Sequence, residues 1–215
     1  ASVYQKAITL DPKQAAWHHR LAELYESRRE TSSAIQHYQN ATDLAQKQNA
    51  HPHETANYVA ALARAYARLN DLAHAADQFD RALILRDDVQ AWWAQCGEIN
   101  LALKNFERAW ECFDHADDLA SLIGAARAAL ALNRNDDAQE KILAALHLNS
   151  DNADALLLLA EVYMRRADYD NALSAYGTAA NVADEPRNAL IAHAALLLDL
   201  DQPMKAVGSL KRVLT

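Results

Sequence analysis

The sequence predicts an all-α fold, a right-handed α-solenoid of helical hairpins, from three observations. Apolar side chains recur at helical spacing, as where Ala75, Phe79 and Ala82 follow one another at steps of four and three. The same order of small, large and small residues returns at nearly constant intervals along the chain. Only four glycines and four prolines interrupt an alanine-rich sequence, which suits closely packed helices and leaves no strand pattern.

Three columns of residues define the repeat. The first small column holds Ala34, Ala75, Ala109, Ala138, Ala172 and Ala206, at steps of 41, 34, 29, 34 and 34. The large column holds Tyr38, Phe79, Phe113, Ile142, Tyr176 and Leu210, and the second small column holds Ala41, Ala82, Ala116, Ala145, Ala179 and Val213. Tyr4 and Ala7 stand 34 residues before Tyr38 and Ala41, so one leading helix precedes six hairpins. Thirteen helices are therefore expected.

These columns predict a single repeat array over residues 1–215. The leading helix is expected at 1–11, and the hairpins at about 13–48, 55–88, 90–118, 119–150, 153–184 and 187–215. Asp71 is placed to cap the second helix of its hairpin. Because the chain has no initiator methionine and begins inside a second helix, we expect it to be an excerpt of a longer protein.

Two irregular steps predict local changes. The step of 41 adds seven residues, which we assign to two extra turns of a second helix and to a His51-Pro52-His53 connection. The step of 29 removes five residues, so Asp117-Asp118 is expected to be nearly the whole connection before a helix that starts at Leu119.

The repeat resembles the tetratricopeptide repeat (TPR) family, whose hairpin carries W-x2-L-G-x2-Y and then A-x3-F-x2-A. The matching segments are Trp93-x2-Cys96-Gly97, Leu21-Ala22-x2-Tyr25, Leu62-Ala63-x2-Tyr66 and Leu159-Ala160-x2-Tyr163. The fourth hairpin departs from the pattern at Ala126 and Ala129, and glycine is kept only at Gly97. Alanine is nearly as small, so close packing of the helices is still expected.

The resemblance implies that the first helices of the hairpins line a concave groove that binds a peptide or helix of a partner. The inward residues expected to contact this partner are Asn57, Arg64, Arg68, Ile123, Arg127, Leu130, Leu157, Met164, Ile191 and Leu198. One inward column alternates in charge through Glu23, Arg64, Glu98, Arg127 and Glu161. It is interpreted either as a ladder of salt bridges between repeats or as groove arginines that receive carboxylates. The apolar positions form either an open strip or side chains half-buried by neighbouring helices.

Composition narrows the function. A net charge of −8 argues against nucleic acid as a partner, which would need clustered Lys and Arg. Cys96 and Cys112 are too few for a disulfide framework or a zinc site, so packed free thiols are expected. His51-x-His53 and Cys112-x2-His115 lack the partners that a metal site or an activated nucleophile needs. No apolar run reaches the roughly 18 residues of a membrane span.

We therefore predict a non-enzymatic scaffold for protein-protein interaction, with a protein or peptide partner, no cofactor, no metal and no catalytic residues. The alternative is a non-catalytic TPR arm of a larger enzyme or of a bacterial envelope or polysaccharide assembly machine. A third hypothesis is self-association through the terminal hairpins. A cytoplasmic location is expected, or a periplasmic one if the parent protein carries a signal.

Overall fold

The computed structural model describes residues 2–214, and all of the regular secondary structure in this part of the chain is helical. The helices are α1 (Ser2–Leu10), α2 (Ala15–Ser27), α3 (Thr31–Lys47), α4 (Pro52–Arg68), α5 (Leu72–Leu85), α6 (Gln90–Ala102), α7 (Phe106–Phe113), α8 (Leu119–Ala131), α9 (Asn135–Leu148), α10 (Ala153–Arg165), α11 (Tyr169–Val182), α12 (Arg187–Asp199) and α13 (Pro203–Val213). The chain is an all-α solenoid of helical hairpins, as predicted.

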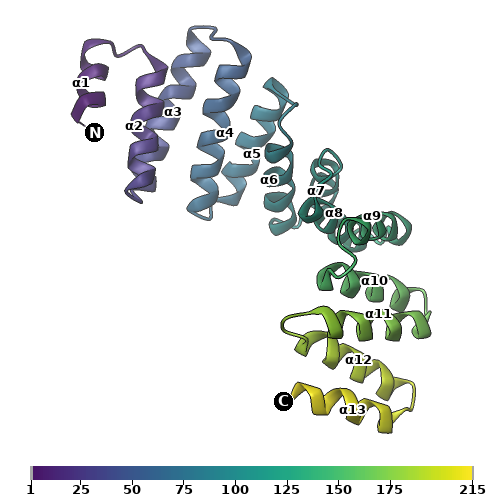
Figure 1. Ribbon diagram of the computed structural model, residues 1–215. Helices are drawn as coiled ribbons and strands as arrows, with labels where there is room; N and C mark the ends of the chain where they lie inside the picture. The colour runs from purple at the N-terminus through teal and green to yellow at the C-terminus, as the bar shows by residue number, and fades with distance from the viewer. Residues whose placement is uncertain (1, 215) are drawn as a thin grey trace. The chain divides into compact units, whose positions relative to one another are not determined.

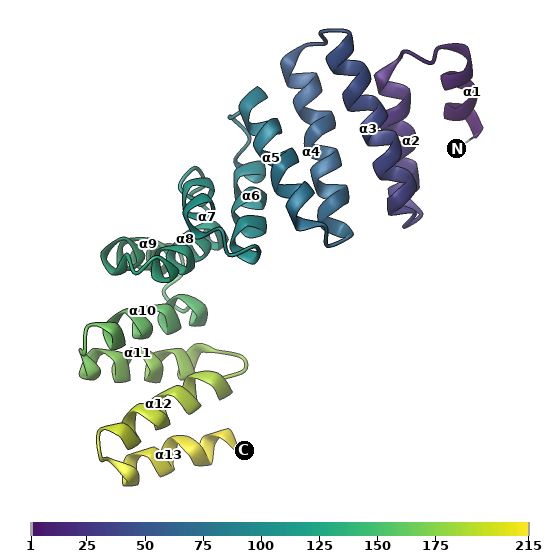
Figure 2. The same ribbon diagram turned by 180° about the vertical axis from the view of Figure 1, so that it is seen from behind.

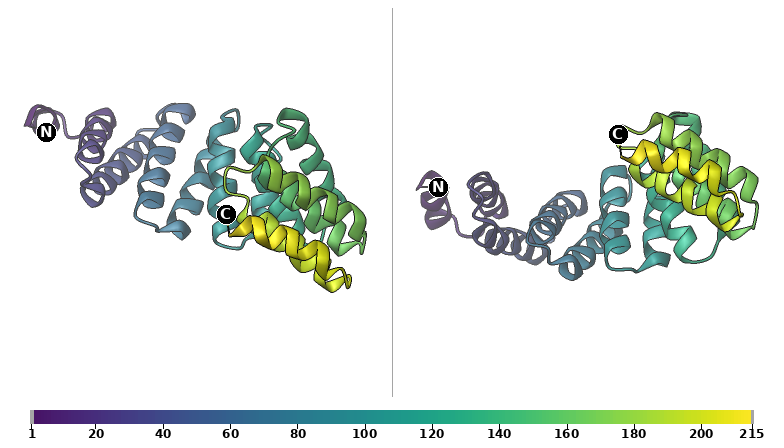
Figure 3. Two further views of the ribbon diagram at one scale, coloured as in Figure 1. Left: turned by 60° about the horizontal axis from the view of Figure 1, so that its bottom comes forward. Right: turned by 90° about the horizontal axis from the view of Figure 1, so that it is seen from below.

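The helices form two compact units, one ending at His115 and the other beginning at Ala116. The first unit holds α1 to α7, and the second holds α8 to α13. Within each unit, consecutive helices lie side by side in chain order (Figures 1 and 2). Figure 3 shows the same order within each unit from two further directions. No helix in residues 2–214 is both long and apolar enough to cross a membrane.

The predicted columns form the interior of the hairpins. Ala75 and Phe79 on α5 are fully buried, and so is Ala172 on α11. Burial of a side chain the size of Phe79 contributes about 1.5 to 3 kcal/mol to stability. The alanines beside it let the two helices of the hairpin approach closely. The last hairpin is more open, since Leu210 in the large column is exposed.

All six hairpins within residues 2–214 turn in the same way. The second residue after the end of each first helix has a positive φ, and none of these residues is glycine: Arg29, Asn70, Lys104, Asn133, Ala167 and Asp201. The amide after each one donates to the carbonyl five residues earlier, as from Asp168 to Tyr163 at 2.9 Å. This bond satisfies a carbonyl that the helix leaves free. The turn therefore repeats in step with the columns.

Polar side chains cap several helices at their N-termini. Asp71 accepts a hydrogen bond from the His74 amide at 3.3 Å, which confirms its predicted role. Asp118 caps α8 through the amides of Ala120 and Ser121, at 3.0 and 3.1 Å. Such a cap contributes about 1 kcal/mol, because it satisfies amides that have no partner inside the helix.

The positions of the two irregular steps were predicted. The helices and connections to which the extra and missing residues were assigned were partly wrong. The seven extra residues are shared between α3 and α4, each of 17 residues. His51 is the N-cap of α4, and Pro52 and His53 lie in its first turn, so they are not a connection. Proline fits this first turn because its missing N-H is not needed there.

The shortened step removes residues from α7 and not from the connection. This helix has eight residues and ends at Phe113, whereas α5 has 14. The link to α8 is therefore residues 114–118, which is longer than the expected Asp117-Asp118.

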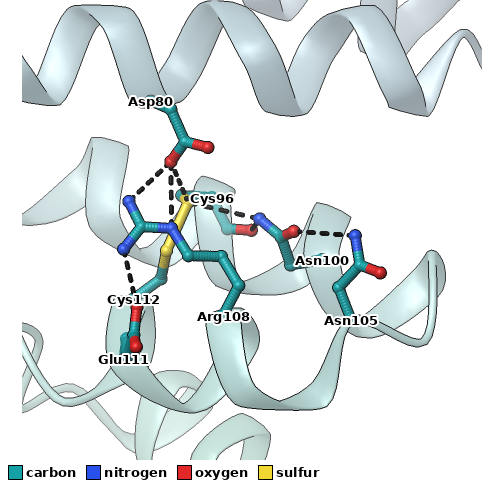
Figure 4. A network of polar contacts seen from close by, with 7 residues as sticks. All are labelled: Asp80, Cys96, Asn100, Asn105, Arg108, Glu111 and Cys112. Atoms are coloured by element: carbon teal, nitrogen blue, oxygen red, sulfur yellow. Dashed lines mark hydrogen bonds and ion pairs between the residues drawn. A yellow bond between two sulfur atoms is a disulfide. The ribbon is translucent and has the colours of Figure 1, made fainter.

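The expectation of two free thiols was also wrong. Cys96 on α6 and Cys112 on α7 form a disulfide, with their Cα atoms 5.9 Å apart. Cysteine counting alone could not predict it, because the pairing depends on two facing helices that bring buried positions to the same height. Figure 4 shows the polar residues around the disulfide.

Candidate functional site

The first unit presents three of the predicted partner-binding residues on one face of α4. Asn57, Arg64 and Arg68 follow one another at steps of seven and four, which places them on one side of the helix. Asn57 and Arg68 are exposed, and Arg64 is half-buried. We call this side of the unit, to which α2 and α6 also contribute, the inner face.

Two hollows on the inner face share Arg64. The smaller has a volume of about 300 Å³ and is lined by Arg64, Ala67, Arg68, Phe79, Gln95, Glu98 and Ile99. The larger has a volume of about 460 Å³ and is lined by Ala16, His19, Arg20, Glu23, Glu54, Asn57, Tyr58, Arg64 and Trp92. The guanidinium of Arg64 is therefore the group that connects them.

Glu26 organises the charges beside Arg64. Tyr38 donates its hydroxyl hydrogen to Glu26 Oε2 at 3.0 Å, and Arg68 Nη1 forms an ion pair with Glu26 Oε1 at 2.8 Å. Burial raises the pKa of Tyr38, and the neighbouring Glu26 carboxylate acts in the same direction. Oε2 of Glu26 thus accepts a hydrogen bond, whereas Oε1 has only the ion pair with Arg68 and no hydrogen bond.

Arg64 has no hydrogen bond or ion pair to any group in residues 2–214. Burial is the largest influence on its pKa and lowers it; Tyr38 and Glu26 oppose this, and Arg68 adds to it. A half-buried guanidinium loses hydration without gaining an acceptor, which is unfavourable until an acceptor arrives. Its N-H groups are arranged to hold a carboxylate through two parallel bonds.

Besides Glu26 Oε1, two buried atoms of residues that line the hollows have no hydrogen-bond partner. They are Nδ1 of His19, in the larger hollow, and Oε1 of Gln95, in the smaller one. His19 Nε2 lies 3.3 Å from Glu23 Oε1, and burial lowers the pKa of the imidazole despite this carboxylate. The inner face thus has hydrogen-bonding groups available on α2, α4 and α6.

The expected ladder of charges is not formed within either unit. Arg64 pairs with neither Glu23 nor Glu98, and Arg127 pairs with Asp154 at 3.0 Å instead of Glu161. Glu161 pairs with Arg165 on its own helix. Glu23, Arg127 and Glu161 thus pair outside the column, whereas Arg64 forms no ion pair in residues 2–214.

The predicted residues of the second unit differ in exposure. Ile123 and Leu130 on α8 are buried, and Arg127 between them is exposed. Leu157 and Met164 on α10 are half-buried. On α12, Ile191 is 45% exposed and Leu198 51% exposed. The apolar strip is thus covered on α8 and increasingly open toward α12.

Sequence reasoning missed a second set of interactions around the disulfide (Figure 4). Arg108 on α7 bonds to Asp80 on α5, with its Nε 3.0 Å from Asp80 Oδ1, and to Glu111 at 2.9 Å. Asp80 Oδ1 also lies 3.8 Å from Cys96 Sγ. Column alignment could not reveal these contacts, because they join different positions of different helices. In residues 2–214, no three His, Cys, Asp or Glu side chains are placed to hold a metal ion.

The hairpins define the chain as a helical repeat protein. Two segments match tetratricopeptide repeat families, residues 123–187 and residues 16–50. The chain therefore contains tetratricopeptide repeats in both of its units. No curated protein sequence matches it.

Several solved structures share the fold at low sequence identity. YrrB, described as a TPR protein with an unusual peptide-binding site, is 19% identical, with a TM-score of 0.77 over 88% of this chain and 96% of its own. A tetratricopeptide repeat protein from Parabacteroides merdae ATCC 43184 is 15% identical, with a TM-score of 0.74 over 100% of this chain and 80% of its own. MamA is 17% identical, with a TM-score of 0.69 over 75% and 91%. The TM-scores establish a shared fold.

Proposed function

We propose that the chain is a non-enzymatic protein-interaction scaffold, and that the inner face of its first unit binds an acidic segment of a partner protein. The observation that carries this proposal is the half-buried guanidinium of Arg64, which lines both hollows without an ion pair. A carboxylate of the partner would bond to Arg64 and restore the interactions that burial removes. The proposal assigns no catalytic step to this chain.

The neighbouring groups suit a peptide. Asn57 is exposed and can both donate and accept hydrogen bonds, as the peptide main chain requires. Gln95 offers another unsatisfied polar atom in the smaller hollow. Phe79 and Ile99 supply its apolar wall, against which a short side chain can pack. YrrB, with the same fold, is described as having a peptide-binding site, which supports the proposed class of ligand.

A peptide library panned against the intact protein tests this assignment. Peptides recovered on the unmodified protein should be rich in Asp and Glu, and Arg64→Ala should reduce their affinity by about tenfold or more, because it removes a charge-assisted hydrogen bond. Arg81→Ala is the matched control, since Arg81 is exposed on α5 and lines neither inner hollow. Equal affinity for the unmodified protein and Arg64→Ala would exclude Arg64 as the donor that binds the partner's carboxylate.

For the second unit, we propose that the exposed apolar residues of α12 bury apolar side chains of a protein partner. Ile191 and Leu198 lie on one face of the helix, two turns apart. Leu198→Asp should abolish binding to a partner isolated with the intact protein, whereas Val207→Asp, on α13, should preserve it. Helicity of both variants is checked first by circular dichroism. Loss of binding in both variants, or in neither, would contradict the proposal.

A further inference from the structure

A hollow of about 590 Å³ lies over the second helices of the second and third hairpins. It belongs to the first unit and is lined by Asp80, Leu83, Ile84, Asp87, Trp93, Arg108 and His115. None of these residues lines the hollows of the inner face. We call it the α5–α7 hollow. Its size is within the range of pockets that bind small ligands or single side chains.

Ile84 is unusual among the residues at this hollow. It is 84% exposed and lies five residues after Phe79 of the large column. The same position in three other hairpins holds a polar residue: Asp43, His147 and Asn181. Packing inside the hairpin therefore does not require an apolar side chain here. An exposed isoleucine beside a hollow is instead a contact that a partner can bury.

Trp93 gives the hollow a fixed wall. Its Nε1-H donates to the carbonyl of Asp87 at 2.7 Å, which ties the indole to the loop after α5. The His115 ring stacks on the indole at a centroid distance of 3.9 Å. The Arg108 guanidinium carbon lies 5.8 Å from the indole centroid. These three contacts hold the ring before any ligand binds, so little side-chain entropy is lost on binding.

The edge of the hollow carries excess negative charge. Asp80 and Glu111 both contact Arg108, so two carboxylates share one guanidinium. Asp87 adds a third carboxylate and is exposed, with no ion pair within residues 2–214. A positively charged group of a partner would find unpaired acceptors here.

We infer that the α5–α7 hollow docks a protein segment in which an apolar side chain is flanked by lysine or arginine. The apolar side chain packs against Ile84, Leu83 and the indole of Trp93, and the flanking cation pairs with Asp87. This surface uses chemistry opposite to that around Arg64, which receives a carboxylate. It does not depend on the function proposed for the inner face.

The probe is a short capped peptide with lysine on both sides of a leucine, added to the intact protein. Binding should shift the indole N-H resonance of Trp93 in nuclear magnetic resonance spectra, because that N-H is bonded to the loop that carries Asp87. The resonance is assigned with Trp93→Phe. A peptide with glutamate in place of lysine should leave the resonance unmoved.

Variants of exposed residues give the second measurement. Ile84→Ser should weaken the lysine peptide by about tenfold, from lost apolar burial. Asp87→Asn should weaken it by about threefold, as for one exposed ion pair. Leu143→Ser and Asp43→Asn are matched controls on the exposed surfaces of α9 and α3, and should leave the affinity unchanged. Arg64→Ala should also have no effect.

Three results would each overturn the inference. The first is equal binding of the lysine and glutamate peptides. The second is a shift confined to the indole signals of Trp17, Trp92 or Trp110. The third is a loss of affinity in the control variants as large as in Ile84→Ser and Asp87→Asn.

Discussion

The two units use the same hairpin but present different chemistry on their first helices. On α4, Asn57, Arg64 and Arg68 form a polar, positively charged face. On α12, the exposed large apolar residues are Ile191 and Leu198, which stand at the positions of Ala60 and Ala67 in α4. The first small column is alanine in both units and is fully buried. The comparison teaches that the buried columns specify the backbone, whereas the exposed positions of the first helices can differ in chemistry without changing it.

The largest expected difference between the units concerns the disulfide, which only the first unit contains. Cys96 and Cys112 are separated by 16 residues, and closing a loop of that length contributes about 3 kcal/mol. Reduction by a dithiol reagent should therefore speed amide hydrogen exchange in α6 and α7 and leave α10 to α13 unchanged. Mass spectrometry after alkylation without reduction is the control. Two alkylated cysteines in the unreduced protein would show that the bond does not form.

A larger side chain in the first small column of the second unit should destabilise the helices around it, just as reduction of the disulfide should affect only α6 and α7. Ala172 is fully buried where α11 meets its neighbours, and a larger side chain there costs about 1 to 3 kcal/mol. Ala172→Leu should lower the midpoint of thermal unfolding, with faster hydrogen exchange in α10 and α11. Ala195→Leu, at an exposed position of α12, should leave both unchanged. If both substitutions lowered the midpoint of thermal unfolding equally, burial in the column would not be the cause of the destabilisation.

The turn of the fifth hairpin offers a smaller, stabilising change. Ala167 has a φ of 57°, a left-handed conformation that alanine adopts at a cost and glycine adopts freely. Ala167→Gly should raise the free energy of unfolding by about 0.5 to 1 kcal/mol, after allowing for the greater freedom of glycine in the unfolded chain. The same change inside a helix, Ala195→Gly, should have the opposite sign. Chemical denaturation of both variants measures the difference.

The smallest expected effect is a pH dependence in the first hairpin. Nδ1 of His18 and Nδ1 of His37 lie 3.1 Å apart between α2 and α3, so one ring must accept the hydrogen that the other donates. Burial lowers the pKa of both residues, and His37 further lowers that of His18. The unfolded chain then binds more protons than the folded one. This contribution to stability is complete above the unfolded pKa of about 6.5 and is lost as the pH falls below it.

Hydrogen exchange at neutral and mildly acidic pH, corrected for intrinsic rates, tests the histidine pair. Protection of α2 and α3 should decrease in acid, and His37→Phe should remove most of this decrease. Identical protection at both pH values would contradict the prediction.

The sequence contains enough information to predict the helices and several of their ends. The alanine and aromatic columns predict which faces pack together, and Asp71 predicts where α5 begins. These features depend on residues close to one another in the chain. The shortening of α7 was harder to place, because a missing segment shifts the columns equally whether it comes from the helix or from the link.

The side-chain contacts of the candidate sites depend on neighbours from different hairpins. The pair of Arg68 with Glu26 and that of Arg108 with Asp80 join residues at different positions of the repeat. Aligning equal positions therefore predicts the wrong partners. One signal was available at the α5–α7 hollow, where Ile84 stands in a position that is polar in other hairpins.

The recurring left-handed turn makes the repeats interchangeable at the level of the backbone. Asn133 and Ala167 have φ values of 60° and 57° and are 34 residues apart, the regular step of the columns. Removing residues 134–167 would join Asn133 to Asp168, so that a left-handed residue would again precede the N-cap of α11. The array could thus be shortened by one repeat without designing a new junction. The length of the array, and with it the number of hairpins, can therefore change by whole repeats.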